Sequence, residues 1–269
     1  MIDPYLESIL IFSGINIILA LSLYLPISAG LLSLGHGGFM AIGAYMSAAC
    51  TALYGLPFLP SLVLGAVMAG LVGAIVGFPA LRIKGVYLII LTMGFGEITR
   101  VFFLNFEPTG AASGLGGIPP DTTLALVWFI VAILLFGFFQ LRRSRLGRVM
   151  TAIRDDELAA EVIGINLARI KVAVFAAGAA LGGLGGGLYA HYALFIDPAQ
   201  FGFHRSAEIF IMVLLGGMGN YLGATLGAIV FTVLPEVLRG LQDWRMTLFG
   251  SLLVILMIVR PWGLIGARR

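Results

Sequence analysis

A few polar residues lie inside long apolar stretches of this sequence, and their presence there calls for a chemical explanation. They are His36, Glu97 and Arg100. An ionisable side chain is costly to place in lipid, so such residues are candidates for a transport pathway or for ion pairs. Glu97 and Arg100 are three residues apart and share one helical face, which suits a structural ion pair as well as a gate. His36 suits a packed helix contact as well as a pathway.

The sequence lacks the residue patterns that enzyme catalysis or metal binding would need. The histidines His36, His191 and His204 are far apart in the sequence and lack the spacing of metal ligands. The single cysteine, Cys50, permits no disulfide within the chain. The sequence has no G-x-x-x-x-G-K-[ST] loop to cradle the phosphates of ATP. We therefore expect neither an enzyme nor a protein with a bound cofactor of its own.

The composition points to the membrane. Of the 269 residues, 60% are hydrophobic and only 11% are charged, and the mean hydropathy is +1.05. A soluble domain carries about 25% charged residues, and one bilayer crossing takes about 20 apolar residues. This excludes a soluble enzyme, a nucleic-acid-binding protein and a disordered chain. We expect a single all-α polytopic membrane domain over residues 1–269, with about 8–10 transmembrane helices.

Apolar runs bounded by charges and by Gly/Pro clusters predict the positions of the spans. The predicted spans are 5–25, 30–54, 58–80, 85–104, 122–141, 172–193, 206–217, 221–238 and 244–260. The short runs 26–35 and 206–217 could instead be re-entrant, which leaves the count between eight and ten. Basic residues gather on the side that we expect to be cytoplasmic: Arg82, Lys84, Arg142, Arg143, Arg145, Arg148, Arg154, Arg169, Lys171, Arg260, Arg268 and Arg269. This pattern predicts an N-terminus outside and a C-terminus in the cytoplasm.

Glycines interrupt the apolar runs at three places, 33–38, 94–97 and 216–220. Broken helices at membrane depth are tolerated where they are buried in protein or line a water-filled cavity. Close helix packing is the alternative explanation, and the glycines of 182–187 favour it. The candidates for a translocation pathway are Gly35, His36, Gly94, Gly96, Glu97, Gly216, Gly217 and Gly219.

The one long hydrophilic segment, 142–171, contains a short amphipathic helix at about 155–164. Asp155 or Asp156 can cap its start, and Gly164 suits its end. Its apolar stripe at helical spacing is formed by Leu158, Val162 and Ile165. A helix this short is marginal in water and needs a surface to pack against, such as a groove of a partner. The alternative is a solvated loop with one amphipathic turn.

This segment resembles the Glu-Ala-Ala-x-x-x-Gly loop of bacterial ABC-importer permeases. Here it is written Leu158-Ala159-Ala160-x-x-x-Gly164, with Leu158 at the first position and the acid one residue earlier, at Glu157. In that form it is similar to the loop of branched-chain amino acid permeases. Five further segments resemble the same subfamily, in the same order: 32–39, 82–87, 113–119, 214–219 and 260–264. The resemblance covers residues 28 to 265.

The resemblance implies the permease of an ATP-driven importer in a bacterial inner membrane. The implied partners are two ABC ATPase subunits that use the ATP, a second homologous permease and an extracytoplasmic substrate-binding protein. The implied cargo is branched-chain or other small apolar amino acids, with urea or short amides as an alternative. A self-contained secondary transporter or channel, with Glu97 as ion carrier, is a competing hypothesis. The residues expected to couple to the ATPase are Arg154, Asp155, Asp156, Glu157, Ala159, Ala160 and Gly164.

Overall fold

The computed structural model describes residues 3–80, 83, 85–237, 250, 251, 254, 258 and 263–265. The described residues form α-helices and short 3₁₀ turns, with no strand beyond one isolated bridge between Leu115 and Ile196. This confirms the all-α fold. Several basic positions used for the expected sidedness lie outside the described residues: Arg82, Lys84, Arg260, Arg268 and Arg269.

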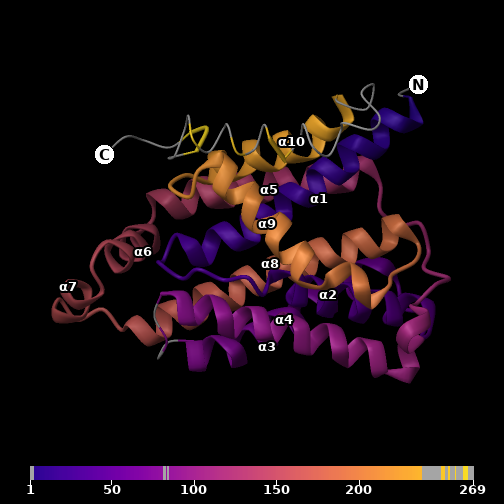
Figure 1. Cartoon of the computed structure of the whole chain (residues 1–269), viewed down its shortest axis with the longest axis horizontal. Helices are drawn as coiled ribbons and strands as arrows, with labels where there is room; N and C mark the ends of the chain where they lie inside the picture. Colours follow the sequence, from indigo (N-terminus) through magenta and orange to yellow (C-terminus); the bar gives the residue numbers. More distant parts are fainter. Residues whose placement is uncertain are drawn as a thin grey trace.

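Five long apolar helices run roughly side by side along the long axis of the molecule (Figure 1). They are α1 (Pro4–Ile27), α3 (Phe58–Ala80), α4 (Val86–Asn105), α5 (Leu124–Arg143) and α8 (Leu167–Ala193). Each is long and apolar enough to cross a bilayer. Five of the predicted spans are thereby confirmed as helices, with ends that differ by a few residues.

Three helices are shorter: α2 (His36–Ala52), α9 (Phe203–Gly216) and α10 (Tyr221–Val237). The unit Pro198–Gly216 meets α10 at an angle of 119°, so this pair is either a broken span or a re-entrant loop. With that pair counted as one, the described residues hold up to six spans by length and composition. This is fewer than the eight to ten expected, and 244–260, where we expected the last span, lies almost entirely outside the described residues.

The predicted span 30–54 is wrong at its start, because residues 28–35 are not helical and α2 begins only at His36. Side chains of other helices satisfy the backbone at this break. The Leu34 N–H donates to Thr92 Oγ1 at 3.0 Å, and the Gly37 N–H donates to Ser206 Oγ at 2.9 Å. Irregular backbone within an apolar bundle is stable only with such partners.

Helix α8 runs through the middle of the bundle and packs against α1, α2 and α3. Its glycines make these approaches possible. A Cβ on Gly178 would lie 2.7 Å from the carbonyl oxygen of Ser22, and one on Gly183 would lie 2.5 Å from the Cβ of Ala69. The packing role expected for the glycines of 182–187 is confirmed.

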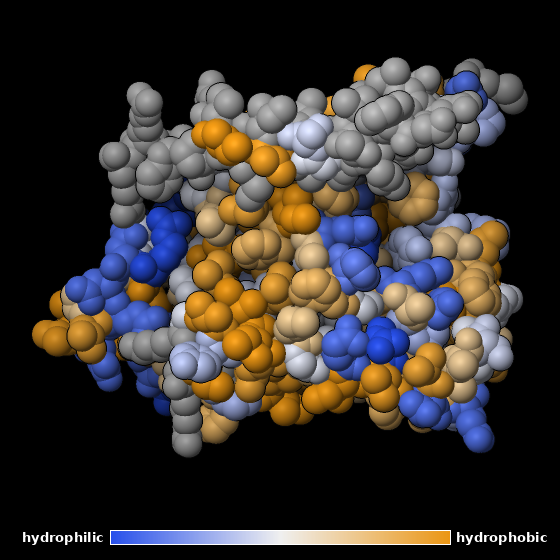
Figure 2. All heavy atoms as spheres, viewed as in Figure 1, coloured by the Kyte–Doolittle hydropathy of each residue, from blue (hydrophilic) through white to orange (hydrophobic). Residues whose placement is uncertain are grey.

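The charged segment 142–171 is mostly helical, and α8 begins five residues earlier than predicted because Asn166 caps it. The segment forms α6 (Arg145–Asp155) and α7 (Glu157–Val162), which project from one end of the bundle (Figure 1). The opposite end carries η1 (Glu107–Thr109), η2 (Ala111–Ser113) and η3 (Pro198–Phe201). Apolar side chains cover much of the middle, and hydrophilic ones gather around α6 and α7 (Figure 2).

Candidate functional site

The short helix α7 has well-defined ends. At its start, Asp156 Oδ1 accepts the N–H groups of Leu158 at 2.9 Å and Ala159 at 3.1 Å, so Asp156 is the capping residue of the two that we considered. At its end, Gly164 has a φ of +87°, and the N–H of Ile165 donates to the Ala160 carbonyl at 3.1 Å. The left-handed glycine ends the helix as predicted. The helix itself is shorter than the expected 155–164.

The apolar side chains of α7 point away from the rest of the chain. Leu158 is 70% exposed, Val162 87% and Ile163 74%, whereas Ala160 is buried. An apolar tip is visible at this end, next to hydrophilic surface (Figure 2). Of the expected stripe, Leu158 and Val162 are exposed, and Ile165 is half-buried. Within the described residues, the amphipathic helix therefore lacks the covering surface that so short a helix needs.

An ion pair links α7 to the central helix α8. The ammonium of Lys171 lies 2.5 Å from Glu157 Oε1, and the side chains are 6% and 26% exposed. At the end of α6, directly before α7, Arg154 and Asp155 form a looser pair at 3.7 Å, and Gly30, in the break after α1, lies against the backbone of Arg154. Among the expected coupling residues, Ala159 is exposed at the surface and Ala160 is packed inward.

The pathway candidates do not come together at one place. Gly35, His36 and Gly96 lie where α2 meets α4, and there the glycines are packing positions. A Cβ on Gly35 would lie 2.7 Å from the carbonyl oxygen of Thr92. His36 is fully buried, and its Nε2 lies 3.2 Å from the carbonyl oxygen of Ser22.

The other glycine candidates lie apart from that crossing. Gly216 and Gly217 are buried where α9 turns into α10, and Gly217 has a φ of +108°. Gly94 and Gly219 are exposed, with open space where a Cβ would be. The set thus divides into close packing, a tight turn and two surface positions.

Glu97 is engaged twice. Its Oε2 lies 2.7 Å from Arg100 Nε, and its Oε1 accepts the N–H of Phe203 at 3.0 Å, at the first residue of α9. The carboxylate thereby joins α4 to the start of α9, where an anion also suits the helix dipole. An ion carrier at this position would first have to give up both contacts.

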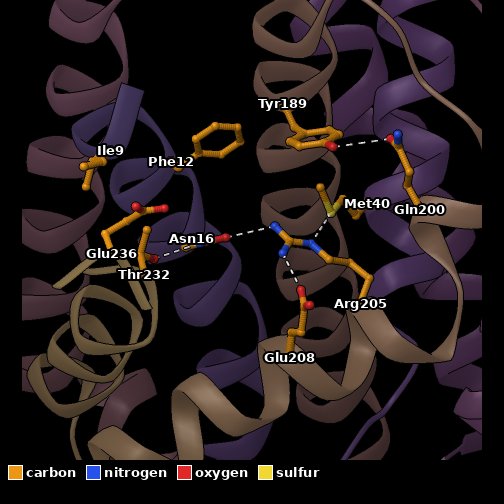
Figure 3. A pocket seen from close by; sticks show the side chains of 10 residues that line it. All are labelled: Ile9, Phe12, Asn16, Met40, Tyr189, Gln200, Arg205, Glu208, Thr232 and Glu236. Carbon is orange, nitrogen blue, oxygen red and sulfur yellow. Dashed lines mark hydrogen bonds and ion pairs between the residues drawn. The ribbon is translucent and has the colours of Figure 1, made fainter. Parts of the chain in front are cut away.

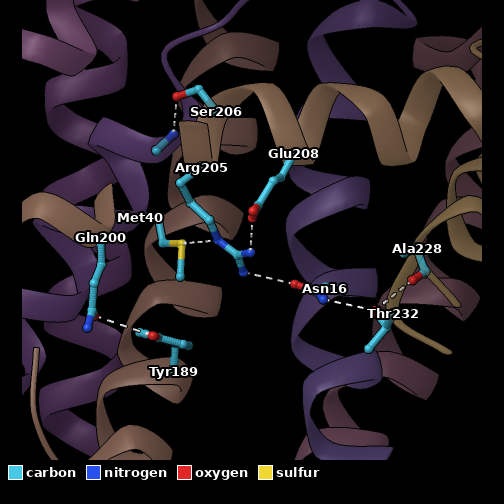
Figure 4. Close-up of polar contacts among 10 residues, drawn as sticks. Asn16, Met40, Tyr189, Gln200, Arg205, Ser206, Glu208, Ala228 and Thr232 are labelled. Carbon is cyan, nitrogen blue, oxygen red and sulfur yellow. Dashed lines mark hydrogen bonds and ion pairs between the residues drawn. The ribbon is translucent and has the colours of Figure 1, made fainter. Parts of the chain in front are cut away.

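A polar cavity of about 430 Å³ lies between α1, α2, α8, α9 and α10 (Figure 3). Arg205 is its central cation. Its Nη1 lies 2.7 Å from Glu208 Oε2, its Nη2 lies 2.9 Å from Asn16 Oδ1, and its Nε lies 3.5 Å from Met40 Sδ. The Asn16 amide donates in turn to Thr232 Oγ1 at 2.9 Å (Figure 4). The other lining residues are Ile9, Phe12, Tyr189, Gln200 and Glu236.

A family model described as the permease component of the branched-chain amino acid transport system matches residues 5–259. The chain belongs to this permease family. It is 37% identical to the high-affinity branched-chain amino acid transport system permease protein LivM of Escherichia coli K12, over 95% of this chain and 67% of that protein. The probable LivM of Methanocaldococcus jannaschii is 28% identical over 76% of this chain and 67% of its own length.

The permease LivH of Escherichia coli K12 is also similar to this chain, at 29% identity over 54% of this chain and 48% of its own length. Family membership agrees with the resemblance that the loop 154–166 suggested. No solved structure shows a significant match.

Sequence reasoning about this permease missed the Arg205 cavity. A signal was present, because Arg205 and Glu208 are three residues apart at the start of the apolar run 206–217, and Asn16 interrupts the first span. Each looked like a residue at the edge or inside of a separate helix. Their meeting depends on the arrangement of α1, α9 and α10, which the sequence pattern does not specify.

Proposed function

We propose that this chain is the membrane-spanning permease subunit of an ATP-driven importer for branched-chain or other small apolar amino acids. The observation that carries the proposal is α7, a capped helix whose apolar residues Leu158 and Val162 are exposed at the end of the molecule. The family match and the similarity to LivM support the same function.

In this proposal, α7 docks in an apolar groove of an ABC ATPase subunit, which binds and hydrolyses the ATP. Leu158 and Val162 enter the groove, and Asp156 and Gly164 keep the ends of α7 rigid. Movement of the ATPase then reaches α8 through the ion pair between Glu157 and Lys171. Because α8 packs against α1, α2 and α3, a push at its start is transmitted to the bundle.

The assembly that we propose has two ATPase subunits, a second homologous permease and an extracytoplasmic binding protein that delivers the amino acid. The chain lies in a bacterial inner membrane, with α6 and α7 in the cytoplasm and the C-terminus on the same side. A self-contained transporter would leave the exposed tip of α7 without a role. Glu97, its candidate ion carrier, is already paired with Arg100 and with the N–H of Phe203.

Co-purification with the ATPase tests the proposal. The tagged chain is isolated from its native membrane, either unmodified or with Leu158→Asp and Val162→Asp together. Both side chains are exposed, so the changes leave the interior of the bundle intact. Tyr54→Asp is the matched control, because Tyr54 is 77% exposed in the turn after α2. Thr51 and His191 meet next to that turn at 3.0 Å, near the end of α8 that is remote from α7.

We expect an ATPase to accompany the unmodified chain and the Tyr54→Asp chain. The α7 double variant is expected to insert normally and to lose the ATPase. If the unmodified chain brings no ATPase in mild detergent, or if the double variant retains it fully, the proposed docking is wrong. Competition of leucine uptake by urea or acetamide distinguishes the amino acid cargo from the amide alternative.

A further inference from the structure

The Arg205 cavity places both signs of charge side by side in an apolar bundle, with the Arg205 side chain largely buried and the Glu208 side chain 43% exposed at the cavity mouth. Arg205 and Glu208 are 2.7 Å apart, and the Arg205 side chain is only 16% exposed. Charged groups in such surroundings are expensive, which makes them candidates for function. The volume of about 430 Å³ is in the range of small-molecule sites, which is about 300–1,000 Å³.

The guanidinium is held in place and keeps binding capacity. Its contacts to Glu208, Asn16 and Met40 use three of the five N–H donors of an arginine. Asn16 is itself fixed by Thr232, whose hydroxyl donates to the carbonyl of Ala228 at 2.8 Å (Figure 4). Among the described residues, no acceptor is found for the remaining two donors, which suit a carboxylate.

The cavity also has an apolar wall. Phe12 and Ile9 of α1 lie across the cavity from Arg205, and Met40 lies beside its guanidinium (Figure 3). Apolar side chains facing a fixed pair of charges form a surface for a molecule with a polar head and an apolar tail. Glu236 completes the wall on the α10 side and accepts a hydrogen bond from the Tyr5 hydroxyl.

The cavity extends from the middle of the bundle toward the end that is remote from α7. The C-terminal end of α1 leads to Gly30, which lies against Arg154 of α6 and so is near α7. Ile9 and Phe12 therefore lie toward the opposite end of α1, and Asn16 lies at its middle. Arg205 likewise stands at the start of α9, directly after η3 at that end. In the proposed assembly, that end of the bundle faces away from the ATPase.

We propose that this cavity binds the transported molecule as a zwitterionic α-amino acid with an apolar side chain. Arg205 receives the carboxylate, Glu208 receives the ammonium, and Phe12 and Ile9 contact the side chain. The amino and carboxyl groups of an α-amino acid are joined through a single carbon, so adjacent opposite charges on the protein match them.

This inference rests on the proposed function. Binding of three ligands tests the site separately from the importer function. Binding to the purified importer in nanodiscs, without the binding protein, is followed by saturation-transfer NMR, which detects weak ligands. The probes are leucine, leucinamide without the carboxylate, and 4-methylpentanoate without the ammonium. Leucine is expected to bind at least about tenfold more tightly than either analogue, because each lost charge removes a charge-assisted hydrogen bond.

The variants assign each end of the ligand. Arg205→Met is expected to lose the preference for leucine over leucinamide, and Glu208→Gln to lose the preference over 4-methylpentanoate. Arg205→Met combined with Glu208→Met removes both charges together and leaves the net charge of the cavity unchanged, so it controls for an unpaired charge. Arg143→Gln is the control for loss of a surface arginine, because Arg143 lies over the ring of Phe139 on α5.

Equal binding of all three ligands by the unmodified importer would overturn the site, and so would unchanged preferences in both single variants. Those results leave the importer function standing if ATP-dependent leucine uptake persists in proteoliposomes. If the unmodified importer takes up no amino acid at all, the proposed function fails instead.

Discussion

The ion pair between Glu157 and Lys171 is expected to hold α7 against α8, and its loss should be measurable in the permease alone. Lys171 is nearly enclosed, with 6% of its side chain exposed, so Glu157→Gln leaves a buried ammonium without its carboxylate. Breaking a buried pair by removing one partner costs about 3–5 kcal/mol. We expect about 2 kcal/mol here, because the pair lies beside an open groove from which water can reach the ammonium.

The assay is thermal unfolding of the purified chain in detergent, followed by the loss of the monodisperse peak after heating. For a chain of this size, about 2 kcal/mol corresponds to a Tm lower by about 4–8 °C. Lys171→Met should cost less, about 1 kcal/mol, because Glu157 is 26% exposed and can be hydrated. The matched control is Glu161→Gln, an exposed carboxylate one turn later on the same helix, which should leave the Tm unchanged.

Exchange of the two charges, with Glu157→Lys and Lys171→Glu in one chain, should recover part of the lost stability. The measurement uses the chain without its ATPase, so an effect on docking cannot imitate an effect on this contact. A Glu157→Gln chain as stable as the unmodified one, or a charge exchange no better than the single variants, would refute the reasoning.

Three further outcomes follow from other contacts. Gly178→Ala should lower the free energy of unfolding by about 1–3 kcal/mol, because the added Cβ would lie 2.7 Å from the carbonyl oxygen of Ser22. The control is Gly137→Ala, where the added Cβ meets open space, and it should be neutral or stabilising in the same thermal assay. Asp156→Ala removes the cap of α7 and should destabilise this helix by about 1 kcal/mol. Faster hydrogen exchange at the N–H groups of α7 should report the loss. Glu97→Met loses both the ionic contact to Arg100 and the acceptor for the Phe203 N–H, so proteolysis near the start of α9 should become faster, and unchanged cleavage would count against the bridging role.

Much of the fold could be predicted because the bilayer limits the solutions. A run of about 20 apolar residues has to satisfy its backbone within the segment, so length and hydropathy nearly determine a helix. This holds for α1, α3, α4 and α5, whose ends lie close to the predicted ones. The same reasoning failed at residues 28–35, because side chains from distant parts of the chain support the break. Thr92 accepts the N–H of Leu34, and Ser206 accepts the N–H of Gly37 in the first turn of α2.

The local structure of α7 could also be predicted from the sequence. Its cap, its left-handed glycine and its apolar stripe depend on neighbours within about two helical turns. Spacing alone could therefore assign Gly164 and narrow the cap to Asp155 or Asp156, of which the structure shows Asp156. The sequence could not show which alanine faces outward, because a short helix can pack on either face. In the structure, Ala160 is the one that packs inward.

The sequence by itself determined that this chain is a helical membrane permease with a short amphipathic helix between two spans. Only the tertiary structure decided how its polar residues group. Glu97 joins α4 to α9, and Asn16, Arg205 and Glu208 meet around one cavity. The physical reason is that helix formation in an apolar segment is a local matter. The partner of a buried charge is set by which helices pack together, and glycine contacts such as Gly178 against α1 determine that packing.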